Sequence, residues 1–273
     1  MLTTATDVPL LSINSDMYSF HTCESKEQSS SSRTIFNIIK SFLGSGALTL
    51  PLAFKEAGYI GALILFPAAF VICLYCMMLL LECRLKRPLC PTYCDLVRNA
   101  FGETGFAIAN IALVSFQVCC TIAYIVLASH NLSLVYSKLS QQEWCYILMA
   151  PIGLLCLLKS PKGLAPFSLL ANLSLLCVIV FVSWFSGSEL LNNGISSEVV
   201  AFKSDTFLSS IGIFIFSFEG VTLVLPLFNT MQGQHRFKPI FATTLSILCT
   251  IYVFYALGAY FALEIPLMGS LPS

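Results

Sequence analysis

Charged side chains are scarce in this sequence of 273 residues. They make up 10% of the chain, whereas charged residues account for about 25% of a typical soluble domain. Hydrophobic residues make up 57%, and the mean hydropathy is +0.84. The 14 basic and 14 acidic residues balance, so nothing suggests a surface that binds nucleic acid. This composition excludes an ordinary soluble protein and predicts an integral protein that crosses the lipid bilayer several times.

Side chains that catalyse reactions or bind metals are also few. Only three histidines occur, and none lies in the middle of an apolar segment. The sequence shows neither a cluster of metal ligands nor a glycine-rich phosphate loop after a strand. Most of the 12 cysteines lie within apolar segments, where they read as small hydrophobic side chains. We therefore expect no enzyme, no cofactor and no bound metal.

The chain divides into a polar start, a long apolar part and a short end. Residues 1–33 are rich in serine and lack the apolar core of a secretory signal, so they are predicted to be a disordered cytosolic tail. Residues 34–263 are predicted to be a membrane domain of seven spans, and residues 264–273 a short tail outside the cytosol. The expected spans, of which the fourth is short, cover residues 34–57, 60–81, 106–130, 144–158, 164–185, 207–228 and 239–263.

Basic residues outside these segments predict the orientation of the chain. One side of the membrane would carry Lys26, Arg33, Arg84, Lys86, Arg87, Arg98, Lys159, Lys162, Arg236 and Lys238, and the other only Lys138 and Lys203. The positive-inside rule then places the N-terminus in the cytosol. The membrane would be the plasma membrane or a lysosome- or vacuole-type membrane, and the sequence predicts no particular oligomeric state.

One carboxylate, that of Glu219, lies inside an apolar segment. A charged side chain at the centre of a membrane costs on the order of 3 kcal/mol, so by default it marks a functional site. Residues 207–216 precede the stretch 217–220 and span about 15 Å, which is half of a hydrocarbon core roughly 30 Å thick. Glu219 is therefore expected near the middle of the membrane.

Two of the apolar segments are predicted to contain a broken helix. The first has Gly44, Ser45 and Gly46 followed by Pro51, and the sixth has Gly220 followed six residues later by Pro226. Glycine costs close to 1 kcal/mol in a helix interior, and proline kinks a helix. Such glycines can simply let helices approach each other. Two interrupted segments at corresponding positions, however, indicate the substrate site of a transporter.

Three stretches resemble motifs of the amino acid/auxin permease family, most closely those of its proton-coupled amino acid transporter branch. They are residues 40–58, 166–172 and 216–227, and the resemblance covers residues 34 to about 263. It implies a leucine-transporter-type all-α bundle, in which spans one to five and six to ten form an inverted repeat with broken first and sixth helices.

The chain departs from this family pattern in three respects. Seven spans leave the second repeat incomplete. Tyr75 stands where the branch has a histidine in its second span. Cys145 has no partner in the loop 187–206, where the branch has a cysteine in an outer loop.

The motifs and the breaks together predict a carrier that binds a small neutral amino acid and a proton. The amides near Gly46 would bind the substrate carboxylate, and the carbonyl groups near Ser217 its ammonium group. Phe218, with Gln117 and Tyr124, would set the size of the pocket. The expected substrate-binding residues are Gly44, Ser45, Gly46, Ala47, Ser217, Phe218, Glu219 and Gly220.

Glu219 is open to three interpretations. It could carry the coupled proton, because burial disfavours the charged form. It could instead accept hydrogen bonds from the amides of its own half-helix, or pair with Lys40. The incomplete second repeat also leaves an alternative function, a truncated carrier that does not transport and acts as a sensor, a regulator or a partner of a full-length transporter.

Overall fold

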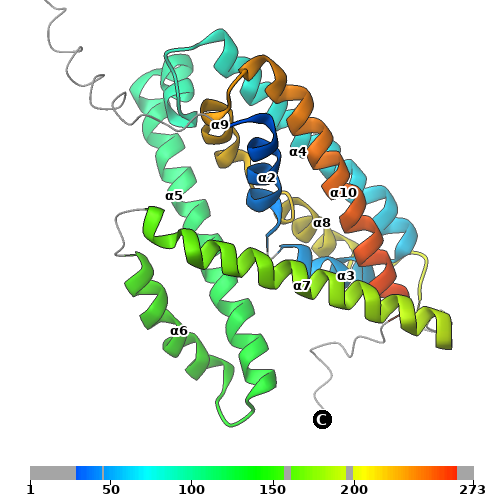
Figure 1. Ribbon diagram of the computed structural model, residues 1–273. Coiled ribbons are helices and arrows are strands. Elements are labelled where there is room, and N and C mark those ends of the chain that lie inside the picture. Colours follow the sequence, from blue (N-terminus) through cyan, green and yellow to red (C-terminus); the bar gives the residue numbers. More distant parts are fainter. Residues whose placement is uncertain (1–28, 45, 157–160, 195–198, 263–273) are drawn as a thin grey trace, which may run out of the picture.

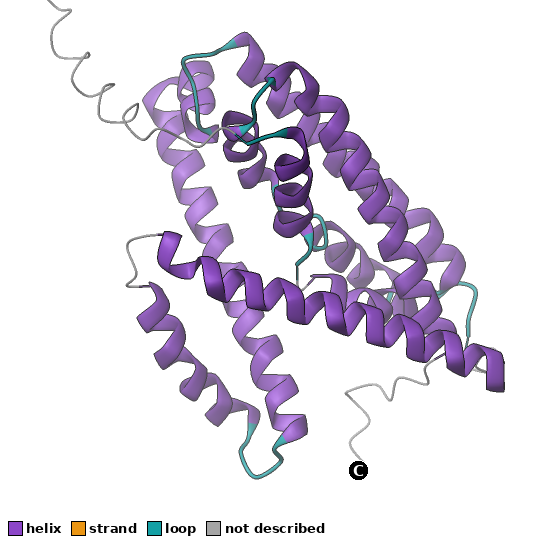
Figure 2. Ribbon diagram, viewed as in Figure 1, coloured by secondary structure: helices purple, strands orange, loops and turns teal. Residues whose placement is uncertain are grey.

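The computed structural model describes residues 29–44, 46–156, 161–194 and 199–262, apart from the side chains of Cys156, residues 161–166 and Asn193. Within these ranges the regular structure is helical, with one isolated bridge between Ser29 and Met231 (Figure 2). An all-α membrane protein is therefore confirmed. The helices are α2 (Ser31–Phe42), α3 (Gly46–Ala57), α4 (Tyr59–Lys86), α5 (Tyr93–Val135), α6 (Gln141–Cys156), α7 (Pro161–Asn193), α8 (Phe207–Phe216), α9 (Val221–Thr230), η1 (Gln234–Arg236) and α10 (Phe237–Ala262).

Most of the expected spans correspond to helices of sufficient length. Five helical stretches in the described residues are long and apolar enough to cross a membrane, namely α4, α5, most of α7, α8 with α9, and η1 with α10. Helices α2 and α3 together would make a sixth span, bent by 55°. The fourth expected span corresponds to α6, whose 16 residues fall short of the roughly 20 that a span needs. A seventh span therefore stays a prediction.

Helices extend into the loop that the sequence suggested at residues 82–105. Helix α4 continues to Lys86, and α5 begins at Tyr93 because Thr92 and Asp95 form a capping box. A kink follows at Gly102, whose φ is +71°. Hydropathy shows which residues can lie in lipid, whereas capping side chains decide where a helix begins. The helices therefore extend beyond the apolar segments that hydropathy marks as the expected spans.

The buried core lies among α2, α3, α4, α8, α9 and α10, which form one bundle (Figure 1). The hairpin of α5 and α6 lies to one side of this bundle, and α7 crosses in front of it and packs on α10. Phe54, Phe66 and Phe214 are fully buried, and their ring centroids lie 5.4 to 6.0 Å apart with edge-to-face angles. Each such pair stabilises by about 0.5–1.5 kcal/mol beyond its buried area. These rings join α3, α4 and α8.

The loop before α8 is fixed against the turn between α3 and α4. The Tyr59 amide donates to the Val200 carbonyl over 3.2 Å, and the Ile60 amide donates to the Ala201 carbonyl over 3.0 Å. Gly58 forms the turn with φ +75°, and a Cβ atom there would lie 2.7 Å from the carbonyl oxygen of Ala201. The close approach of these two backbones therefore requires glycine.

Replacement of Gly58 by alanine is expected to lower the melting temperature of the detergent-purified chain. The positive φ alone costs roughly 1–2 kcal/mol, and the clash with a fixed backbone adds about 1–3 kcal/mol. Gly194→Ala is the matched control, because φ is +76° there and nothing lies within 4 Å of the Cβ position. Circular dichroism should show a larger decrease for Gly58→Ala. Equal decreases for the two variants would contradict the close backbone contact.

Candidate functional site

The first helix is broken where the sequence predicts it. Helix α2 ends at Phe42 and α3 begins at Gly46. The Ala47 amide donates to the Gly44 carbonyl over 3.1 Å, which starts the new helix with a tight turn. Ser45, an expected substrate ligand, lies outside the described residues. At this break the last carbonyl groups of α2 and the first amide groups of α3 have no partners within their own helices. A polar ligand can form hydrogen bonds with such groups.

The second break has the same form. Helix α8 ends at Phe216 and α9 begins at Val221, with a short loop between them (Figure 2). The Glu219 amide donates to the Phe216 carbonyl over 3.0 Å, so the end of α8 tightens to a three-residue spacing before the chain leaves the helix. Gly220 then has an extended φ of 170°. Glu219 thus lies in the interruption itself.

The two breaks touch each other through their backbones. A Cβ atom on Gly46 would lie 2.8 Å from the Cα atom of Ser217, and Ser217 Oγ lies 3.4 Å from the Gly46 carbonyl oxygen. At Gly220 a Cβ atom would lie 2.5 Å from the ring of Phe42. The start of α3 therefore packs on the end of α8, and the end of α2 packs on the start of α9. Gly44 differs, because nothing lies within 4 Å of its Cβ position.

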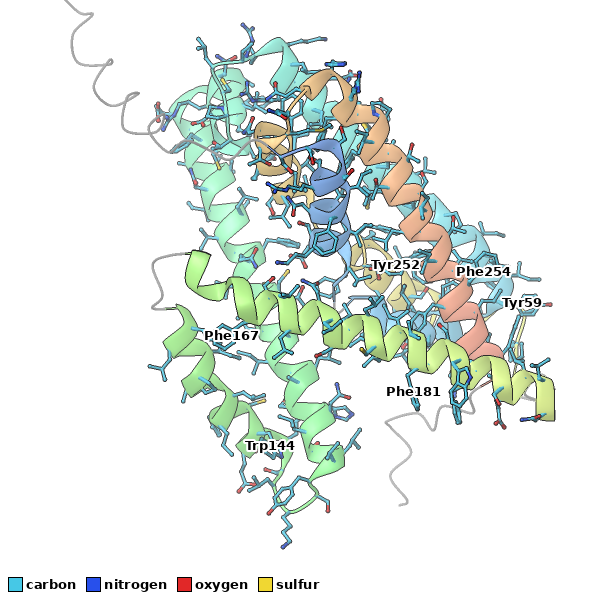
Figure 3. The ribbon with its side chains drawn as sticks, in the orientation of Figure 1. Tyr59, Trp144, Phe167, Phe181, Tyr252 and Phe254 are labelled. Atoms are coloured by element: carbon cyan, nitrogen blue, oxygen red, sulfur yellow. The ribbon has the colours of Figure 1, made fainter. Side chains whose placement is uncertain are left out.

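A tyrosine from a distant helix caps the first break. Tyr252 of α10 is fully buried, and its hydroxyl donates to the Phe42 carbonyl at the end of α2 over 2.9 Å. Figure 3 labels Tyr252 and also Phe254, which lies two residues further along the helix and is 72% exposed. The sequence reasoning missed Tyr252. Its hydroxyl in an apolar segment was the available signal, because a buried tyrosine usually finds a hydrogen-bond partner.

The expected substrate residues differ in their surroundings. Ala47 and Phe218 are both buried, and the Phe218 ring packs against Phe66 and Phe70 of α4 with centroids 5.1 and 5.2 Å away. This ring therefore supports the break from the core side. Gln117, expected near the pocket, is exposed on α5.

Glu219 interacts with α5. Its half-buried carboxylate accepts a hydrogen bond from the Tyr124 hydroxyl, with 3.2 Å between Oη and Oε2. Within the described residues no ion pair joins Glu219 to Lys40, so the structure does not support the pairing that the sequence left open.

A cavity of about 600 Å³ lies beside the first break, between α2, α7 and α10. Its walls include Leu43 and Lys40, whereas none of the seven expected substrate residues that the structure describes lines it. Among the described residues of this lining, Lys40 is the charged one, and the mainly aliphatic remainder also includes Asn172, Thr243 and Thr244. In the part of the chain that is described, no group of three or more His, Cys, Asp and Glu side chains could hold a metal ion.

Comparison with known proteins finds a matching family and relatives that are named as amino acid transporters. The sequence model of the family described as "Transmembrane amino acid transporter protein" matches residues 27–263. Amino acid transporter ANT1 of Arabidopsis thaliana is 29% identical over 256 residues, which cover 86% of this chain and 57% of that protein. Vacuolar amino acid transporter 3 of Saccharomyces cerevisiae is 28% identical over 247 residues, which cover 86% of this chain and 35% of that protein.

The chain spans about half the length of the first curated relatives that it matches, between 47% and 60%. No solved structure matches it significantly. The matched family and relatives are named as transporters, in agreement with the expectation that the chain is not an enzyme.

Replacement of Gly46 by alanine tests the contact between the two breaks. The added methyl group would meet the backbone of Ser217, which cannot move away without displacing α8. We expect a loss of about 1–3 kcal/mol from overpacking and a lower melting temperature in detergent. Gly44→Ala is the control, since its Cβ position is open, and it should leave the melting temperature nearly unchanged. A Gly46→Ala variant as stable as Gly44→Ala would show that the breaks are further apart.

Proposed function

Because the chain belongs to the family of transmembrane amino acid transporter proteins, we propose that it carries small neutral amino acids across a membrane together with protons. The observation that carries this proposal is the contact of Gly46 with Ser217, which brings two helix breaks to one place. The relatives whose names include "vacuolar" favour a vacuole- or lysosome-type membrane. The N-terminus would lie in the cytosol, as the distribution of basic residues predicts.

The polarity of the helix ends suits a zwitterion. Helix α3 begins at Gly46 and presents the partial positive charge of its first amides, whereas α8 ends at Phe216 and presents the partial negative charge of its last carbonyl groups. Both ends meet at the contact between the breaks. A substrate there can place its carboxylate at the start of α3 and its ammonium group at the end of α8, because these two groups are separated by a single carbon atom.

Open space beside Gly44 favours a substrate position on the Gly44 side of the contact between Gly46 and Ser217. The Cβ position of Gly46 is blocked by Ser217, while that of Gly44 is open. The nearby cavity includes Leu43, the residue before Gly44. We place the substrate on this open side, with Gly44, Ser45 and Ala47 around it. The buried ring of Phe218 would hold the facing backbone in position.

Glu219 would carry the coupled proton. Its carboxylate is half-buried within the second break and accepts from a tyrosine hydroxyl, so it has a site of its own beside the substrate. A proton taken up there removes a charge that is costly in the membrane interior. Movement of the loaded protein is then less costly than movement of the ionised one, which would couple the proton to transport.

Counterflow in liposomes tests the transport proposal. The purified 273-residue chain is reconstituted into vesicles loaded with unlabelled alanine, and entry of labelled alanine is followed. We expect labelled alanine to accumulate transiently, and external glycine or proline to compete more strongly than lysine. Vesicles without protein are the control. An entry rate equal to that of empty vesicles would contradict the carrier and favour the alternative of a sensor or partner protein.

Glu219→Gln tests the proton pathway. The amide keeps the size of the side chain but cannot take up a proton, so accumulation driven by a pH gradient should fall to the level without a gradient. Exchange in the counterflow assay should persist, since exchange needs no net proton movement. Glu103→Gln is the control, because that side chain is 79% exposed and pairs with Arg98. Full gradient-driven accumulation by Glu219→Gln would exclude Glu219 as the proton carrier.

A further inference from the structure

We propose that Tyr124 is a positioning residue for Glu219, and that its hydrogen bond attaches α5 to the second break more firmly while Glu219 is ionised than after Glu219 has taken up a proton. The inference rests on the proposed function, in which Glu219 binds the transported proton. The helix whose attachment would change when Glu219 binds or releases a proton is α5.

Tyr124 contacts the end of α8 and the interruption that follows it. Its hydroxyl donates to Glu219 Oε2 over 3.2 Å, and its ring lies 5.7 Å from the ring of Phe216 at the end of α8. Cys120 lies four residues earlier on the same face of α5 and is 4% exposed. One face of α5 thus carries both the donor to this carboxylate and a buried thiol one helical turn away.

The rest of α5 makes little contact with the bundle. Near Tyr124 its exposed residues include Val118 at 53% and Ile122 at 55%. The helix packs mainly on α6, and the two lie together beside the bundle (Figure 1). The hydrogen bond from Tyr124 to Glu219 is therefore well placed to control how α5 is held against the broken helix.

The other titratable groups near the break have different roles. On α10 the Tyr252 hydroxyl is bonded to the Phe42 carbonyl. On α2 Lys40 makes no ion pair with Glu219 among the described residues. Helix α4 packs the phenyl rings of Phe66 and Phe70 against the neighbouring Phe218, and Cys119, next to Cys120, is exposed. Among the described residues, Tyr124 is thus the titratable group that the structure joins to Glu219 by a hydrogen bond.

Protonation of Glu219 would weaken the attachment. A hydrogen bond from a neutral hydroxyl to a carboxylate is roughly twice as strong as one between neutral groups. When Glu219 takes up a proton, the charge-assisted bond from Tyr124 becomes an ordinary one. Helix α5 is then held less firmly to the break, and Cys120 becomes accessible. Proton binding would in this way loosen one helix of the carrier.

Thiol labelling tests this link without any need for transport. The reconstituted chain is treated with a membrane-permeant maleimide, and mass spectrometry gives the ratio of labelled Cys120 to labelled Cys119, so that the exposed neighbour serves as the internal reference. In the unchanged protein the ratio should rise as the pH falls through the protonation of Glu219. Tyr124→Phe keeps the ring and removes only the donor, and it should raise the ratio at neutral pH by roughly tenfold, as expected for a lost bond to a charged group.

The controls separate this inference from the proposed function. Tyr146→Phe alters a tyrosine on α6 that is 74% exposed and should behave as the unchanged protein. Glu219→Gln should make the ratio independent of pH. A Tyr124→Phe ratio equal to that of the unchanged protein at every pH would overturn the inference even if uptake persists, whereas absence of uptake by the unchanged protein would overturn only the proposed function.

Discussion

Unpaired backbone groups inside a membrane are the constraint on which this structure depends. A broken helix leaves amide and carbonyl groups that cost several kcal/mol each in lipid unless protein, water or ligand satisfies them. The chain meets this constraint by placing its two breaks against each other. Gly46 lies on Ser217, Gly220 lies under the Phe42 ring, and Tyr252 donates to the carbonyl group at the end of α2. The core of α3, α4, α8 and α10 surrounds this contact.

The remaining contacts at the site follow from that arrangement. Once α8 and α9 are interrupted at residues 217–220, Glu219 leaves the helical surface and faces α5. Phe218, on the other side of the chain, enters the aromatic core. Residues 217–220 thus join the polar contact of Glu219 with α5 to the apolar packing of Phe218 in the core. In the function that we propose, a site of this kind binds a zwitterionic substrate while the surrounding helices stay packed.

Local signals predicted the breaks, whereas tertiary contacts were beyond the sequence. Gly44, Gly46 and Gly220 interrupt long apolar runs, and the structure has its helix ends beside them because glycine weakens a helix wherever it lies. The bond from Tyr252 to Phe42 joins residues that lie 210 positions apart, and the bond from Tyr124 to Glu219 spans 95 positions. No spacing rule predicts such pairs. Gly46 and Gly44 looked alike in the sequence, and only packing distinguishes the blocked position from the open one.

The backbone contact between the two helix breaks can be detected without changing any residue. Solid-state NMR on the chain in lipid bilayers, with ¹³C-labelled glycine and serine, reports carbon pairs that lie within a few ångströms of each other. The account predicts a cross-peak between the Cα atoms of Gly46 and Ser217, since a Cβ atom on Gly46 would lie 2.8 Å from the Cα atom of Ser217. Its absence, in spectra that show the sequential cross-peak of Gly187 with Ser188, would contradict the account.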